Sequence, residues 1–166
     1  APLWVGPAVD RPVLVERDPI ASQIAALLFP DAQVMAGPLE RTPLPDGHFD
    51  LIVGNVPFGN IAVHDPSVEA KRLRASLHGY FVVRAVRAVR PGGIVAVVSS
   101  RYLLDGDDET VRRHLARHAD LLAAWRLPGS VFMHEGVPVA TDVLFLRKRH
   151  RPPVELPRWV GRHRIK

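Results

Sequence analysis

A short polar loop that directly follows an apolar run carries the residue types best suited to chemistry in this chain. The loop reads Asn55-Val56-Pro57-Phe58 and comes after Leu51-Ile52-Val53-Gly54. Asn55 offers a side-chain amide, the backbone of Val56 offers a carbonyl acceptor, and Phe58 offers a flat apolar ring. Pro57 restricts the backbone and so fixes the turn. These groups would face whatever ligand enters beside the loop.

The run before the loop predicts a buried strand. Leu51, Ile52 and Val53 are consecutive rather than alternating with polar residues, which is typical of a strand covered on both faces in a parallel α/β sheet. Such sheets bind ligands at the carboxyl ends of their strands. We therefore expect the loop to lie at a ligand-binding edge of the sheet.

The loop resembles the Asn/Asp-Pro-Pro-aromatic loop of S-adenosylmethionine-dependent DNA methyltransferases that modify exocyclic amino groups, particularly the adenine-specific ones. The resemblance implies that the Asn55 side-chain oxygen and the Val56 carbonyl accept hydrogen bonds from the target amino group, and that Phe58 stacks on a flipped-out base. Val56 stands where the first proline of that pattern is usual. The carbonyl survives this change, because every residue supplies one, but part of the loop's rigidity is lost.

A second candidate site lies earlier in the chain, where a strand predicted over residues 13–16 ends in Glu16. A helix start follows it, with Asp18 as the expected N-cap and Pro19 at the first helical position. The resemblance implies that Glu16 holds the ribose hydroxyls of the cofactor S-adenosylmethionine. The alternative is an exposed strand-end carboxylate paired with Arg17.

The loop after a short strand predicted over residues 33–36 carries Leu39 and Glu40. Methyltransferases of this kind often contact the cofactor's adenine from this loop, so the resemblance makes both residues candidates for cofactor binding. Residues 1–12 contain three prolines and nothing like the Gly-x-Gly loop that these enzymes place after their first strand. We therefore expect the chain to start after that strand and loop, and an upstream segment or another chain to complete the cofactor site.

The later segments predict the rest of a methyltransferase-like sheet. A helix over residues 76–90, ended by Pro91-Gly92-Gly93, precedes a fully buried strand over residues 94–100. The further elements expected are a helix over 110–118 and an antiparallel hairpin of strands over 121–128 and 141–148. The predicted fold is α/β: a Rossmann-like methyltransferase sheet, mostly parallel, with a C-terminal antiparallel hairpin and incomplete at the N-terminus. Residues 1–149 would form this domain, and residues 150–166 a basic, proline-containing tail or linker.

Two further segments, His78–Phe81 and Ser99–Tyr102, resemble the large adenine-methylase proteins of plasmids and phages. The aperiodic stretch 61–74 comes directly after the candidate base-binding loop. Its residues Lys71, Arg72 and Arg74 could bind DNA phosphates, although ordinary solvated charges are the alternative. We assign no metal, because His64 has no second ligand at metal-binding spacing.

The composition agrees with a single domain that binds a polyanion. The 166 residues are 47% hydrophobic, with a formal charge of +5 and an isoelectric point near 10.4. A GC-rich genome, which favours arginine, is the alternative explanation for the charge. The absence of cysteine excludes disulfides and thiolate chemistry. Without a membrane-spanning run or a signal pattern, we expect a cytoplasmic bacterial protein and no membrane partner.

Three functions follow from these patterns. The first is an adenine-specific DNA methyltransferase domain that takes its methyl group from S-adenosylmethionine. The second is a catalytically incomplete methyltransferase-like domain that serves as a DNA-binding or scaffolding module of a larger restriction-type protein. The third is an RNA or protein glutamine methyltransferase, because similar loops also serve those substrates.

Overall fold

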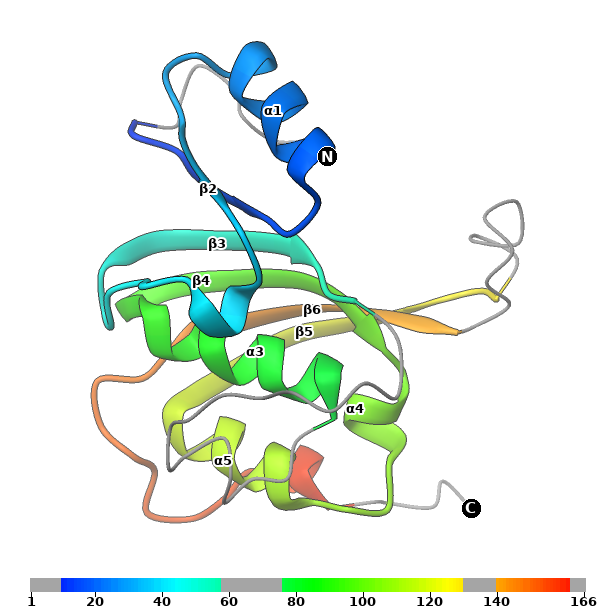
Figure 1. Cartoon of the computed structure of the whole chain (residues 1–166). Helices are drawn as coiled ribbons and strands as arrows, with labels where there is room; N and C mark the ends of the chain where they lie inside the picture. Colours follow the sequence, from blue (N-terminus) through cyan, green and yellow to red (C-terminus); the bar gives the residue numbers. More distant parts are fainter. Residues whose placement is uncertain (1–9, 58–75, 130–139, 162–166) are drawn as a thin grey trace. The chain divides into compact units, whose positions relative to one another are not determined.

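A computed structural model of the chain describes residues 10–57, 76–129 and 140–161. The chain divides into two compact units, Ala1–Leu44 and Pro45–Lys166 (Figure 1). None of the described helices is both long enough and apolar enough to cross a membrane.

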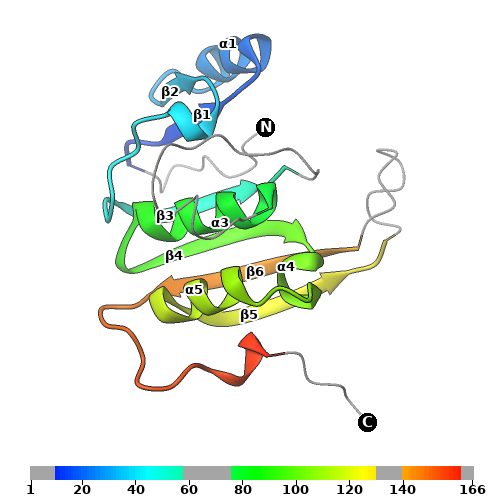
Figure 2. The ribbon, with the colours of Figure 1, turned by 60° about the horizontal axis from the view of Figure 1, so that its bottom comes forward.

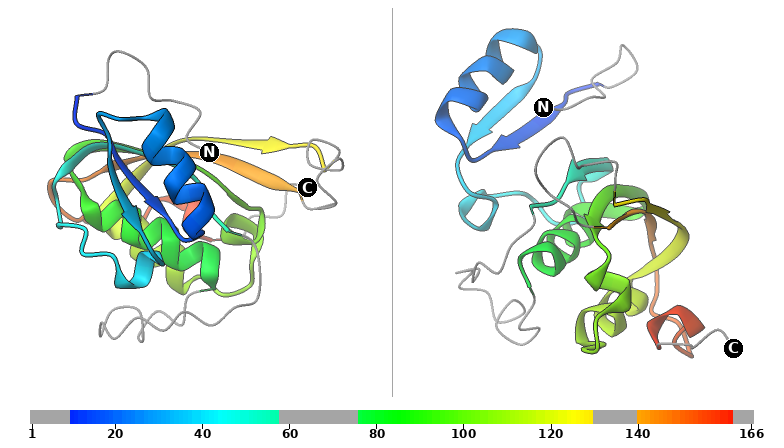
Figure 3. Two further views of the ribbon diagram at one scale, coloured as in Figure 1. Left: turned by 45° about the horizontal axis from the view of Figure 1, so that its top comes forward. Right: turned by 90° about the vertical axis from the view of Figure 1, so that its right-hand side faces the viewer.

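The first unit is a parallel strand pair with one helix, as the sequence predicts. Its elements are β1 (Val13–Glu16), α1 (Pro19–Leu28), β2 (Gln33–Ala36) and a short 3-10 helix, η1 (Leu39–Arg41). Asp18 begins α1 by accepting hydrogen bonds at 2.8 Å from the backbone N–H groups of Ile20 and Ala21. Figure 3 shows α1 beside the two strands. The large apolar residues of α1 are exposed, whereas Ser22 and Ala25 are buried.

The second unit is built on a four-stranded sheet of mixed direction (Figure 2). Its strands, in the spatial order β3-β4-β6-β5, are β3 (Phe49–Asn55), β4 (Val89–Ser100), β6 (Thr141–Lys148) and β5 (Ala119–Leu127). β3 is parallel to β4, and β6 is antiparallel to both of its neighbours. With β1 parallel to β2, this arrangement confirms the predicted parallel strands and the closing antiparallel hairpin.

Two helices, α3 (Leu77–Ala88) and α5 (Thr110–His118), cover one face of this sheet. Figures 1 and 3 show both on the same side. The core between helices and sheet is aliphatic, which makes burial of apolar surface its main stabilising contribution. It includes Val82, Val86, Val89, Val95, Val97, Leu115, Leu144 and Leu146.

The prediction that β3 is covered on both faces is wrong within this unit. Ile52 packs against the core, but Leu51 and Val53 on the opposite face are 52% and 48% exposed. On the same face Trp125 is also exposed, and its ring forms a T-shaped pair with Phe145, with ring centroids 5.2 Å apart. The reason is that α3 and α5 both pack on the face that carries Ile52, and no described helix of this unit covers the other face.

The boundary between α3 and β4 also differs from the prediction. α3 ends at Ala88, and β4 already begins at Val89, which pairs with Phe49. Pro91-Gly92-Gly93 therefore lies inside the strand rather than between two elements. The register shifts there, between Phe49 and Leu51, and Gly92 has the positive φ of 81° that such an irregularity needs.

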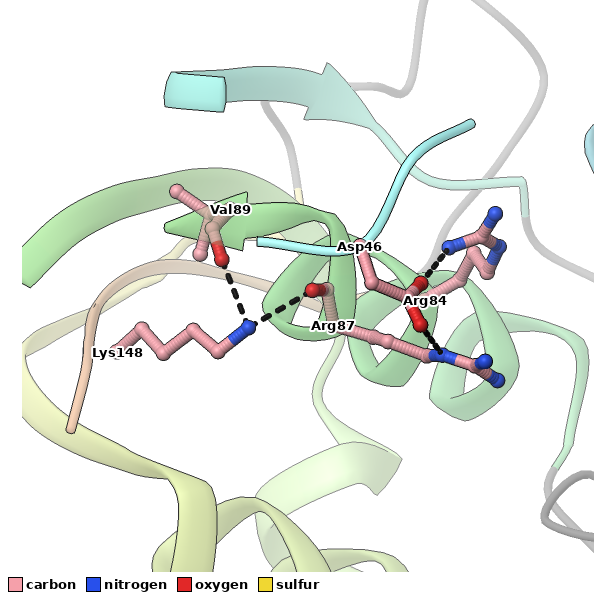
Figure 4. A network of polar contacts seen from close by, with 5 residues as sticks. All are labelled: Asp46, Arg84, Arg87, Val89 and Lys148. Carbon is pink, nitrogen blue, oxygen red and sulfur yellow. Dashed lines mark hydrogen bonds and ion pairs between the residues drawn. The ribbon is translucent and has the colours of Figure 1, made fainter. Parts of the chain in front are cut away.

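Two arginines of α3, Arg84 and Arg87, form ion pairs within the second unit (Figure 4). Asp46 accepts from Arg87 Nε at 2.7 Å and from Arg84 Nη1 at 3.4 Å. Lys148 donates from Nζ to the carbonyls of Arg87 and Val89, both at 2.8 Å, and burial lowers the pKa of this ammonium group. These contacts join the loop before β3, the end of α3 and the end of β6.

Part of the basic tail also has a structural role. Arg112 of α5 is buried and donates from Nε to the carbonyl of Val160 at 2.8 Å. Val160 belongs to a short 3-10 helix, η3 (Arg158–Val160), which the sequence does not indicate. Arg149 binds Asp120 of β5 at 2.6 Å. Within the described tail, Val160 therefore packs against α5.

A substitution at Gly93 tests whether β3 and β4 must approach each other closely at this position. A Cβ atom at Gly93 would lie 2.8 Å from the Asp50 carbonyl oxygen and 2.6 Å from a Val89 methyl group. We expect Gly93→Ala to lower the free energy of unfolding by about 1–3 kcal/mol, as overpacking does. Gly54→Ala is the matched control, because a Cβ there meets nothing within 4 Å. Equal stability of the two variants in urea unfolding would contradict this account.

Candidate acceptor and cofactor sites

The loop that the sequence singles out starts where β3 ends. Asn55 is the last residue of β3 and lies opposite Val98 of the parallel strand β4. Its side chain is exposed. Pro57 follows, exposed as well. Because β3 and β4 are parallel, this is a carboxyl edge of the sheet, where open α/β sheets bind their ligands.

Val56 explains how the loop departs from a double-proline pattern. Its backbone N–H donates to the carbonyl of Val98 at 3.0 Å, and its side chain is 4% exposed, within the core cluster. A proline could not donate this hydrogen bond. Here one more hydrogen bond between β3 and β4 and the burial of the Val56 side chain hold the loop. They compensate for the rigidity that is lost without the first proline.

In the first unit, Glu16 ends β1 opposite Ala36, the last residue of β2. One carboxylate oxygen, Oε1, accepts from the Asp18 N–H at 2.9 Å. This contact holds the side chain at the carboxyl edge of the strand pair. A carboxylate has several acceptor positions, so one such bond leaves capacity for hydroxyl donors.

Leu39 and Glu40 lie at the same edge as Glu16. Both belong to η1, which starts three residues after Ala36, the residue that pairs with Glu16. The turn between them is tied to β1, because the Gly37 N–H donates to the Glu16 carbonyl at 2.8 Å. Gly37 has a φ of 142°, and no atom lies within 4 Å of a Cβ built on it. A carboxylate acceptor, a half-buried leucine and an open backbone turn are groups that fit a nucleoside with a ribose diol.

Four predicted site residues lie outside the described part of the chain: Phe58, Lys71, Arg72 and Arg74. Of the other predicted residues, Asn55, Val56 and Pro57 belong to the second unit, and Glu16, Leu39 and Glu40 to the first. The described residues contain no group of three or more potential metal ligands.

The structure contains one polar cluster that the sequence does not indicate. Arg126 of β5 bridges two acids: it binds Asp142 through Nε and Nη2 at 2.9 and 3.0 Å, and Asp105 through Nη1 at 2.9 Å. These hydrogen bonds, first to Asp142 and then to Asp105, raise the pKa of Arg126 above its ordinary value. Asp105 ends α4 (Tyr102–Asp105), a helix too short to show periodicity in the sequence.

The fold defined by these elements is that of a methyltransferase-like α/β domain, and solved structures share it. The M protein of the type I restriction enzyme EcoKI superposes with a TM-score of 0.65 at 23% identity, over 82% of this chain and 31% of that one. A modification subunit assigned to a type I restriction enzyme of Vibrio vulnificus YJ016 gives 0.69 at 22% identity, over 84% and 33%. A protein of Listeria monocytogenes assigned to the class I S-adenosylmethionine-dependent methyltransferases gives 0.66 at 17% identity, over 89% and 49%.

The sequence is also similar to a family and to a curated relative. The profile of the N-6 DNA Methylase family matches residues 31–155. Defense against restriction protein B of Escherichia phage P1 is 31% identical over 140 residues, which is 80% of this chain and 6% of that protein. The chain belongs to the N-6 DNA methylase family, as the loop predicted. It spans only a small part of the phage relative and less than half of the solved chains.

Proposed function

We propose that this chain forms the catalytic part of an adenine-specific DNA methyltransferase, which transfers a methyl group from S-adenosylmethionine to the exocyclic amino group of a flipped-out adenine. The observation that supports this most is the position of Asn55 and Val56. Two hydrogen-bond acceptors follow one another at the carboxyl end of a parallel strand, in a chain of the N-6 DNA methylase family.

On the acceptor side, the Asn55 side-chain oxygen and the Val56 carbonyl accept the two amino hydrogens of adenine. These bonds increase electron density on the amino nitrogen and orient it for attack. Bringing the base out of the duplex costs a few kcal/mol, which stacking and edge hydrogen bonds must offset. Phe58 would provide the stacking, and Lys71, Arg72 and Arg74 would bind the DNA backbone.

On the donor side, Glu16 would accept hydrogen bonds from the ribose hydroxyls, and Leu39 and Glu40 would contact the adenine of the cofactor. The cofactor supplies an electrophilic methyl group on a sulfonium centre. In the transfer, a nitrogen–carbon bond forms as the carbon–sulfur bond breaks, and the amino group releases one proton to solvent. The protein contributes orientation and electrostatic stabilisation rather than a covalent intermediate.

We also propose that a strand from outside these residues, on an upstream segment or another chain, completes the domain. The Val56 N–H points toward β4. Because backbone directions alternate along a strand, Leu51, Val53 and Asn55 direct their N–H groups to the other side. No strand pairs with that side among the described residues. A long apolar edge of this kind is a template for strand addition. The same edge favours the scaffolding role, because without that strand the chain alone would lack part of its cofactor site.

Two substitutions separate the acceptor role from the cofactor role. We expect Asn55→Ala to reduce methyl transfer to DNA about 10²–10³-fold, the usual effect of deleting one polar stabilising group, while cofactor affinity is unchanged. Asn55→Asp should retain more activity, because the related loops also use Asp.

Glu16→Gln should weaken S-adenosylmethionine binding about tenfold, as expected for loss of charged hydrogen bonds. Asp31→Asn, on an exposed turn of the same unit, is the control.

Calorimetric titration and tritiated methyl transfer measure the two effects. Full activity of Asn55→Ala would show that the acceptor site is misplaced. Failure of the unsubstituted chain to bind S-adenosylmethionine would contradict autonomous catalysis and support the scaffolding role.

Amide hydrogen exchange tests the open edge. In the chain alone, the amides of Leu51, Val53 and Asn55 should exchange at least about a hundredfold faster than those of Ile52 and Gly54, because only the latter two point toward β4. Binding of the completing strand should then protect the fast set. Equal protection of both sets in the chain alone would mean that no strand is missing from this edge.

A further inference from the structure

An exposed arginine–tyrosine pair lies just beyond the end of β4. Tyr102 is 55% exposed, and Arg101 is exposed as well. The guanidinium carbon of Arg101 lies 5.0 Å from the centre of the Tyr102 ring, and its Nη2 is 3.5 Å from the phenol oxygen. The cation and the ring therefore form one composite surface. Neither side chain has a role in the chemistry proposed above.

The backbone that carries this pair is anchored from several directions. Tyr102 begins α4, and Leu103 of the same helix is 4% exposed. At the other end of α4, Asp105 is held by Arg126, whose second carboxylate partner is the buried Asp142. Buried Arg112 donates to the carbonyl of Gly106 at 2.7 Å.

The start of the segment is fixed as well. The Arg101 N–H donates to the Ala140 carbonyl at 3.2 Å, and the Tyr102 N–H to Ser100 Oγ at 3.3 Å. A four-residue helix has little stability of its own, because few of its hydrogen bonds are internal. The side-chain contacts therefore hold an exposed ring on a rigid support, which lowers the entropy cost of binding to it.

The pair also lies close to the acceptor loop along the same edge. Val98 of β4 pairs with Asn55 and accepts the Val56 N–H at 3.0 Å. Arg101 follows Val98 by three residues, which is at most about 10 Å of extended chain. That length corresponds to roughly three stacked nucleotides at 3.4 Å each. A DNA strand with one base at Asn55 would bring its neighbouring nucleotides to Arg101 and Tyr102.

The charge of Arg101 is available for a phosphate. No ion pair joins it to a carboxylate in the described part of the chain, whereas Arg87, Arg90 and Arg113 each have one. The nearest acid on α4, Asp105, is bound to Arg126. Arg101 therefore differs from these three arginines, whose charges are paired with carboxylates.

We propose that Arg101 and Tyr102 bind the DNA strand beside the target adenine, with Arg101 on a phosphate and Tyr102 stacked on a flanking base. This inference rests on the proposed function, because it takes DNA as the substrate. Stacking on an aromatic ring tolerates any base sequence, so the pair would add affinity and position the strand without defining a recognition sequence.

Fluorescence anisotropy with an adenine-containing DNA duplex, measured across a salt series without cofactor, tests the proposal. Arg101→Ala should weaken binding and reduce the slope of log affinity against log salt by about one, and Arg101→Lys should restore the slope. Tyr102→Ala should weaken binding about tenfold without changing the slope, and Tyr102→Phe should retain affinity. Arg113→Ala removes the same charge from α5 and should leave the slope unchanged, because Arg113 pairs with Glu109 at 2.6 Å.

Equal effects of Arg101→Ala and Arg113→Ala, or wild-type affinity of Tyr102→Ala, would overturn the proposal while leaving the proposed function intact. Absence of DNA binding by the unsubstituted chain would instead contradict DNA as the substrate. Thermal unfolding of each variant separates these outcomes from misfolding, because both side chains are exposed and neither should change the midpoint.

Discussion

The pairing of β3 with β4 is the contact on which the proposed acceptor site depends. It places Asn55 opposite Val98, and the Val56 N–H adds one more hydrogen bond beyond the end of β3. Close approach of the two strands needs a glycine at position 93, where any side chain would meet the backbone of Asp50. The position of the Asn55 side chain and the Val56 carbonyl thus depends on the register between β3 and β4. It also depends on Gly93, whose lack of a side chain lets the two strands approach.

Many charged side chains of the described residues form ion pairs and hydrogen bonds within the second unit. Asp46 pairs with two arginines of α3, Lys148 binds carbonyls at the end of that helix, and Arg126 joins α4 to the sheet. The count of 22 lysines and arginines therefore overstates the number of cations that are free to bind a polyanion. Affinity for DNA would have to come from a few specifically placed groups rather than from the average composition.

Local patterns predicted local structure well. Asp18 and Pro19 marked the start of α1, and the apolar run before Asn55 marked β3 with its polar end. The open face of β3 could not be predicted from the sequence. An apolar run such as Leu51–Val53 predicts that a strand is buried, but it does not indicate which element covers each face. The ion pairs of α3 were missed for a related reason: only the tertiary fold brings Asp46 beside residues about forty positions away. The roles of Phe58 and of the basic residues after it stay predictions.

Identification of the methylated product tests the central claim most directly. The chain, in the form that binds S-adenosylmethionine, would be incubated with isotope-labelled cofactor and a mixture of unmethylated DNA, ribosomal RNA and protein. Each fraction would then be digested and analysed by mass spectrometry. Label in N6-methyladenine from DNA is the predicted result. Label confined to RNA or to protein glutamine would contradict the account.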